Sequence, residues 1–150
     1  MRQISVIGSS KANEEEYEVA YRLGKELAKL GLVVVCGGRT GVMEAVCKGA
    51  KEEGGLTVGI LPSYDGHEAN PYVDIRINTG LNWNRNPLVV ASGEMVVAIG
   101  GNYGTLSEIA YALILGKYVV GYKTHKVEGV KHVNSLEEIL KEVKNFFGRD

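Results

Sequence analysis

Short apolar runs alternate along this chain with longer amphipathic segments. A continuous apolar run that is rich in β-branched residues predicts a strand covered on both faces. The amphipathic segments carry apolar side chains at helical spacing, so they predict helices with one buried side. The predicted strands are residues 3–8, 32–36, 57–61, 75–78, 96–99, 118–122 and 130–133.

The helix after the first strand has the clearest boundary signals. Asn13 is a favourable N-cap, Glu16 completes a capping box, and Gly31 ends the segment. Ser135 and Glu138 give the same capping signal before the terminal helix. The remaining predicted helices are residues 42–53, a segment that includes 88–91, and one whose expected apolar side is Leu106, Ile109, Ala110, Leu113 and Ile114.

This order of elements predicts the fold class. Parallel neighbouring strands need crossover connections, which the intervening helices supply. We therefore expect an α/β fold in which residues 1–150 form a single domain, a doubly wound parallel sheet with helices on both faces. Ligands of such sheets bind outside the carboxyl ends of the strands, so the loops at that edge form the candidate site.

Composition and charge argue against several functional classes. The formal net charge is −1, so no basic face is required and we expect no nucleic-acid partner. No apolar run is long enough to cross a bilayer and the N-terminus has no signal-peptide pattern, so we expect a cytoplasmic protein without a membrane partner. Cys36 and Cys47 are not a CxxC pair, and the histidines lack an HExxH-like arrangement. We expect reduced, partly buried thiols and no metal site.

A glycine-rich turn between a predicted strand and its helix carries the strongest candidate chemistry. Gly100, Gly101 and Gly104 let the backbone approach a bound group, and free N–H groups at a helix start favour a phosphate. Thr105 adds a hydroxyl, and Glu108 follows one turn later, where a carboxylate suits a sugar or a leaving group. Alternatively, the glycines only form a turn and Glu108 only complements the helix dipole.

Two glycine-rich segments together resemble the LOG-like superfamily of Rossmann-type proteins. Residues 37–45, GGRTGVMEA, are similar to its GGxxGLMxA motif, and residues 54–62 continue that pattern. Residues 100–108, GGNYGTLSE, resemble its PGGxGTxxE motif with Gly100 in place of proline and Asn102 in place of glycine. Asn tolerates positive φ best among the other residues, so we expect Asn102 to preserve the turn.

The superfamily includes cytokinin-activating nucleoside 5′-monophosphate phosphoribohydrolases and molybdenum-cofactor carrier proteins. The phosphoribohydrolases have an arginine, usually followed by lysine, at the spacing where this chain has Arg85 followed by Asn86. The Arg-Asn pair, with residues 70–72 and 79–81, looks more like the short carrier-like branch. The resemblance therefore implies a Rossmann-like fold and two functions.

In the first function, the chain hydrolyses a nucleoside 5′-monophosphate. Glu108 would then stabilise the ribose, and Arg85 would hold the phosphate or the departing base, so both are candidate catalytic residues. In the second, the chain holds a phosphorylated ligand, such as a molybdopterin-type cofactor or a nucleotide, without turnover. In both, the ligand is a phosphorylated small molecule, an AMP-like nucleotide or molybdopterin, and no further cofactor is required. The ligand-binding residues implied are Gly8, Ser9, Gly37, Gly38, Arg39, Thr40, Gly41, Gly100, Gly101, Asn102, Tyr103, Gly104 and Thr105.

Several neighbouring side chains have plainer alternatives. Lys11 is interpreted as a solvated lysine and Met43 as core filler. Tyr103 and Trp83 either stack on a base or pterin or cover a neighbouring protomer. The resemblance also implies a homo-oligomer, a dimer or a tetramer, with a candidate interface on the helix that carries Ile109, Tyr111 and Leu113.

Overall fold

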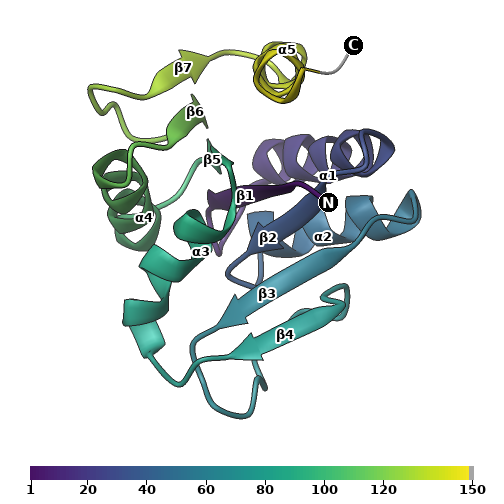
Figure 1. Ribbon diagram of the computed structural model, residues 1–150, viewed down its shortest axis with the longest axis vertical. Coiled ribbons are helices and arrows are strands. Elements are labelled where there is room, and N and C mark those ends of the chain that lie inside the picture. The colour runs from purple at the N-terminus through teal and green to yellow at the C-terminus, as the bar shows by residue number, and fades with distance from the viewer. Residues whose placement is uncertain (149–150) are drawn as a thin grey trace.

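The computed structural model describes residues 1–148 as a seven-stranded parallel sheet with helices on both faces (Figure 1). The strand order is β4-β3-β2-β1-β5-β6-β7, and every neighbouring pair is parallel. The predicted doubly wound sheet is therefore confirmed. The strands are β1 (Gln3–Gly8), β2 (Val33–Cys36), β3 (Thr57–Leu61), β4 (Ile75–Asn78), β5 (Met95–Ile99), β6 (Tyr118–Tyr122) and β7 (Lys131–Val133).

Two apolar cores lie on opposite faces of the sheet. Helices α1, α2 and α5 cover one face, and α3 and α4 cover the other (Figure 1). Within residues 1–148, no helix has the length and apolar character that a bilayer crossing needs. The helices are α1 (Glu14–Lys29), α2 (Val42–Glu52), α3 (Asn86–Ser92), α4 (Tyr103–Ile114) and α5 (Leu136–Phe147), with a 3₁₀ turn, η1 (Asn82–Arg85), before α3.

The predicted apolar side of α4 is only partly correct. Ile109 is fully buried, but Ala110 and Ile114 lie on the surface. At 3.6 residues per turn, the side that faces the sheet also takes Thr105, Glu108 and Ala112. Because Ile109 belongs to the protein's own core, it is not available to an interface between protomers.

The order in which successive strands are placed in the sheet reverses at its centre, beside β1. Strands are added outward from β1 to β4, and the chain then returns to place β5 on the other side of β1. Gly8 and Ile99, the last residues of β1 and β5, pair in register. The loops that follow these two strands therefore leave the same point in opposite directions, the arrangement at which open α/β sheets bind ligands.

Helices α1 and α2 approach so closely that glycine is required on both. A Cβ atom at Gly24 would lie 2.1 Å from the carbonyl oxygen of Val46, and one at Gly49 would lie 2.0 Å from that of Tyr21. Both clashes are with backbone atoms, which cannot rotate away. The two glycines therefore hold α2, and with it the loop before α2, close to the sheet.

Gly49→Ala tests this contact through the sign of its effect. Helix propensity alone predicts a gain of about 1 kcal/mol from alanine in a helix interior. The clash with α1 instead predicts a loss of about 1 to 3 kcal/mol, because the helices must move apart. Urea denaturation of the variant and the wild type measures the difference, and a stabilised variant would contradict the packing described.

Candidate functional site

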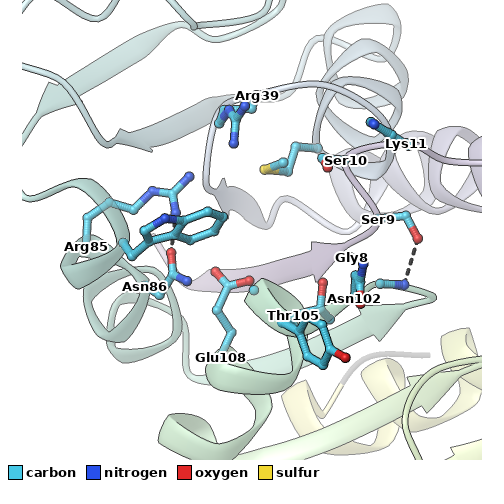
Figure 2. Close-up of a pocket in the computed structure, with 15 residues that line it drawn as sticks. Gly8, Ser9, Ser10, Lys11, Arg39, Arg85, Asn86, Asn102, Thr105 and Glu108 are labelled. Carbon is cyan, nitrogen blue, oxygen red and sulfur yellow. Dashed lines mark hydrogen bonds between the residues drawn. The ribbon is translucent and has the colours of Figure 1, made fainter.

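A cavity of about 550 Å³ opens where β1 and β5 end (Figure 2). It is within the range of small-molecule sites. Its walls come from the loop after β1, the loop between β2 and α2, the η1 turn with the start of α3, and the first turns of α4. The lining residues are Gly8, Ser9, Ser10, Lys11, Arg39, Met43, Trp83, Arg85, Asn86, Gly101, Asn102, Tyr103, Gly104, Thr105 and Glu108.

Most of the residues predicted for the site line this cavity. Arg85 and Glu108, far apart in sequence, face it together (Figure 2). Five predicted ligand residues are not among its lining: Gly37, Gly38, Thr40, Gly41 and Gly100. Five others line it that were not among the predicted ligand residues: Ser10, Lys11, Met43, Trp83 and Asn86.

Gly41 and Thr40, which lie outside the lining, position a loop that forms part of it. Gly41 has a φ of 68°, and a Cβ there would lie 2.1 Å from the carbonyl oxygen of Ser9. That carbonyl accepts the N–H of Val42 at 2.8 Å, which ties the start of α2 to the loop after β1. The hydroxyl of Thr40 donates to the carbonyl of Ser10 at 2.9 Å. These residues therefore position the loop that lines the cavity.

The turn is preserved, as expected, but Asn102 does not adopt the positive φ on which that expectation relied. Its φ is −121°, whereas Gly100 and Gly101 have φ values of 60° and 105°. Proline fixes φ near −65°, so a proline does not fit the conformation that Gly100 adopts. The turn thus departs from the family motif at its first position, and Asn102 occupies a position that does not require glycine.

The start of α4 presents open hydrogen-bond donors to the cavity. The first backbone bond of the helix is donated by Leu106 to Asn102, and the Asn102 side chain does not cap the helix. Within residues 1–148, the N–H groups of Tyr103, Gly104 and Thr105 have no backbone acceptor. The Gly101 N–H is already bound, at 2.6 Å, to the hydroxyl oxygen of Ser9 (Figure 2). The anion-binding amides are therefore those of residues 103–105.

Arg85 is held by the backbone at the ends of the neighbouring strands. It is 5% exposed, and its Nε donates to the carbonyl of Ile60 at 3.0 Å. One terminal nitrogen donates to the Asn86 side chain, and the other lies 3.4 Å from the carbonyl oxygen of Gly37. The amide of Asn86 also donates to Ser107 on α4 at 3.1 Å. Asn86, in place of the family's lysine, thus links Arg85 to α4 without adding a charge.

Glu108 is a buried carboxyl without a close partner. It is 8% exposed, and within residues 1–148 its side chain has no hydrogen bond and no ion pair within 4.0 Å. Burial raises the pKa of Glu108 from 4.5 to about 8, although the charge of Arg85 opposes the shift. Burial likewise lowers the pKa of Arg85, against the attraction of Glu108. Desolvation therefore outweighs the attraction between these two groups.

Two further cations line the cavity. Lys11 and Arg39 form no side-chain hydrogen bond or ion pair with any residue of 1–148. The charge of Arg39 contributes to the lowered pKa of Arg85, which indicates that the two guanidinium groups share one electrostatic environment. With Glu108 protonated at neutral pH, the lining carries three positive groups and no negative one. The cavity is therefore suited to an anion.

The cysteines lie behind the cavity wall. Cys36 and Cys47 are both free thiols and are fully buried, not partly buried as expected, with their sulfur atoms 3.6 Å apart. Within residues 1–148, no cluster of three or more His, Cys, Asp or Glu side chains has the geometry of a metal site.

The raised pKa of Glu108 predicts how stability depends on pH. The folded protein keeps this proton up to about pH 8 and the unfolded chain only to about 4.5, so its contribution is full below pH 4.5 and is lost as pH rises to about 8. Glu108→Gln stays neutral throughout. As pH rises from about 5 to about 9, the wild type should therefore lose stability relative to the variant, on the order of a few kcal/mol.

Denaturation curves of the wild type and the variant at about pH 5 and at about pH 9 measure this difference. Glu128→Gln, at an exposed position, is the matched control: it retains Glu108, so its stability should change with pH as that of the wild type does. A difference between wild type and Glu108→Gln that is the same at both pH values would contradict the buried, neutral carboxyl.

Known proteins resemble this chain over most of its length. An uncharacterised protein of Archaeoglobus fulgidus is 45% identical over 141 residues, which are 93% of each protein. The molybdenum cofactor binding protein of Rippkaea orientalis superposes with a TM-score of 0.91, at 36% identity over 97% of both chains. The molybdenum cofactor carrier protein of Chlamydomonas reinhardtii gives a TM-score of 0.89, at 33% identity over 99% of this chain and 100% of the other.

A plant enzyme matches a shorter segment. The cytokinin riboside 5′-monophosphate phosphoribohydrolase LOG of Oryza sativa is 31% identical over 107 residues, which are 68% of this chain and 44% of the rice enzyme. The homologues thus include both LOG phosphoribohydrolases and molybdenum-cofactor carriers, as the glycine motifs predicted. Because the family's sequence pattern matches residues 1–146, the chain belongs to the SLOG cluster4 family.

Proposed function

We propose that this protein binds a phosphorylated small molecule at the carboxyl edge of its sheet and holds it without turnover. The observation that carries the proposal is the start of α4, where the N–H groups of residues 103–105 open into a cavity that three cations line. We call these three amides with the Thr105 hydroxyl the phosphate cradle. The ligand favoured is a molybdopterin-type cofactor, carried as cargo.

Each part of the cradle suits a phosphate. The amides point along the helix dipole, whose positive end attracts an anion. The first turn of α4 has no acidic residue that would compete with the ligand. Thr105 is 4% exposed and its hydroxyl lies beside the Gly101 turn, so we expect it to donate a hydrogen bond to a phosphate oxygen bound there. Lys11 and Arg39 supply long-range attraction.

The state of Glu108 favours binding over hydrolysis. Cleavage of an N-glycosidic bond develops positive charge on the ribose, which an ionised carboxylate stabilises. A carboxyl whose pKa is about 8 is mostly protonated at neutral pH, so it donates a hydrogen bond instead. In a carrier, that O–H would pair with an acceptor oxygen of the ligand.

The relatives favour the same reading. The molybdenum-cofactor proteins of Rippkaea and Chlamydomonas match nearly the entire chain, whereas the rice phosphoribohydrolase matches 68% of it. Asn86 also replaces the lysine of the phosphoribohydrolase motif, and it forms the link from Arg85 to α4. A carrier requires such a fixed, preorganised wall but no reactive group.

The second candidate function is hydrolysis of a nucleoside 5′-monophosphate. It is favoured by Arg85 and Glu108, which share one cavity at the spacing of the phosphoribohydrolase motif. In that case the negative charge of the bound phosphate would keep Glu108 protonated, and Glu108 would donate its proton to the departing base.

We also propose a homo-oligomer, with the exposed Tyr111 and Ile114 of α4 as contacts. Light scattering of the purified protein tests the oligomer.

Thr105→Val tests the phosphate cradle. The change removes the hydroxyl and keeps the shape, so we expect ribose 5-phosphate to bind about tenfold more weakly, since the bond lost is to a charged group. Calorimetric titration measures the affinity. Ser92→Ala, which removes a hydroxyl that lies outside the cavity lining and bonds to Leu88 of its own helix, should bind nearly as well as wild type. Equal losses in both variants would place the phosphate elsewhere.

Incubation with AMP separates the two functions. We expect no release of free base by chromatography, while AMP and molybdopterin both raise the melting temperature of the protein. Glu108→Gln should then bind AMP as the wild type does, since a neutral amide replaces a neutral acid. Release of base and ribose 5-phosphate by the wild type, lost in Glu108→Gln, would replace the carrier with the hydrolase.

A further inference from the structure

A smaller chamber adjoins the phosphate cradle. It has a volume of about 370 Å³ and is lined by Arg39, Pro62, Asn82, Trp83 and Arg85. Arg39, Trp83 and Arg85 also line the large cavity, so these three side chains form a wall common to both spaces. A ligand whose phosphate lies in the cradle has this second chamber within reach.

Trp83 is exposed on a rigidly fixed backbone. The N–H of Asn82 donates to the carbonyl of Pro62 at 3.0 Å, and Arg85 anchors the other end of the η1 turn through Ile60. Asn82 itself has a φ of 53°, a conformation that costs free energy in residues other than glycine. The turn thus fixes the backbone from which the indole projects, and 66% of Trp83 is exposed.

The indole of Trp83 lies against the start of α4. A Cβ at Gly104 would be 3.1 Å from Cζ3 of Trp83, so the ring covers that glycine. One flat aromatic face therefore lies between the cradle and the second chamber. Flat aromatic faces on protein surfaces are stacking platforms for heteroaromatic rings.

The polar groups of the second chamber are mostly donors. The guanidinium of Arg39 has no partner within residues 1–148, Arg85 retains N–H groups beyond those bound to Ile60, Asn86 and Gly37, and an indole donates only. The lining contains no carboxylate. The chamber therefore favours a ring edge that presents acceptors over one that presents an amino group.

We propose that Trp83, Arg39 and Arg85 form a ring subsite that selects an oxo-substituted heteroaromatic ring attached to the phosphate. The ring stacks on the indole, and the guanidinium groups donate to its oxo oxygen and the adjacent ring nitrogen. Guanine and pterin rings both present such an edge, whereas the matching position of adenine carries an amino donor. This inference rests on the proposed phosphate site and adds the class of ring that the site selects.

Trp83 is the only tryptophan of the chain, so its fluorescence reports the subsite directly. The probes are 5′-GMP, 5′-AMP, a phosphorylated pterin and ribose 5-phosphate, titrated by calorimetry and by tryptophan emission. We expect GMP and the pterin to bind about tenfold more tightly than AMP, with quenched emission, and ribose 5-phosphate to bind without quenching. The ratio of the GMP and pterin affinities identifies which source of the ring is preferred.

Two variants assign the effect to the side chains. Trp83→Ala should bring the GMP affinity to within about threefold of that for ribose 5-phosphate, because the stacking contribution is lost. Arg39→Leu should abolish the preference of GMP over AMP while GMP continues to quench Trp83. Both variants lie on exposed or half-buried positions, and circular dichroism checks that they fold.

The outcomes separate the subsite from the phosphate site. If ribose 5-phosphate binds but GMP, AMP and the pterin bind no better and leave the emission unchanged, the ring subsite is overturned and the phosphate site stands. If AMP binds as tightly as GMP, with quenching, the selection by Arg39 and Arg85 is overturned. If no probe binds, the proposed function fails and the ring subsite fails with it.

Discussion

One hydrogen bond joins the two loops on which the site depends. The Gly101 amide donates to the hydroxyl oxygen of Ser9 at 2.6 Å, directly beyond the paired ends of β1 and β5. The loops leave the sheet in opposite directions at this point, and the N–H of Ser9 also donates to the carbonyl of Ile99 at 3.1 Å, so Ser9 fixes the distance between the two loops. Gly101 adopts a φ of 105° to make the bond, a conformation that a side chain at this position would strain. The start of α4, and the amides that it presents, are positioned as a result.

Charge in the cavity follows from burial more than from pairing. Arg85 and Glu108 would attract each other in any medium, yet desolvation moves the pKa of both toward the neutral form. Arg85 keeps its charge because guanidinium is a very weak acid and because backbone carbonyls accept its N–H groups. Glu108 has no such partner, so it is the group that becomes neutral. The cavity thereby retains a positive character that an unburied pair would cancel.

The sequence predicted the helices, the strands and the sheet well, because local signals and long-range packing agree in these elements. The capping box of Asn13 and Glu16 and the apolar strands lie where the periodicity indicated them. Doubly wound sheets gather the strand ends at one edge, which is why Arg85 and Glu108 could be assigned to one site.

The sequence pattern did not predict which side chains face the cavity. Met43 was interpreted as core filler and does belong to the core, at 8% exposed, but from the start of α2 it also lines the cavity. Lys11 was interpreted as a solvated lysine and is exposed, but from the loop after β1 it also lines the cavity. Asn102 was expected to preserve the turn because asparagine tolerates positive φ, but the positive φ values belong to Gly100 and Gly101, and no spacing rule distinguishes these three positions. The exposure of Trp83 follows from the η1 turn, which has no strong sequence signal.

The site is assembled from segments that range from Gly8 to Glu108, and none of its walls is complete without the others. During synthesis, the loop after β1 leaves the ribosome long before α4 exists, so a nascent chain has no place to hold a ligand until most of the sheet has formed. Occupancy is therefore a property of finished molecules only. A bound ligand would also slow degradation, since a protease needs the open chain that ligand binding disfavours.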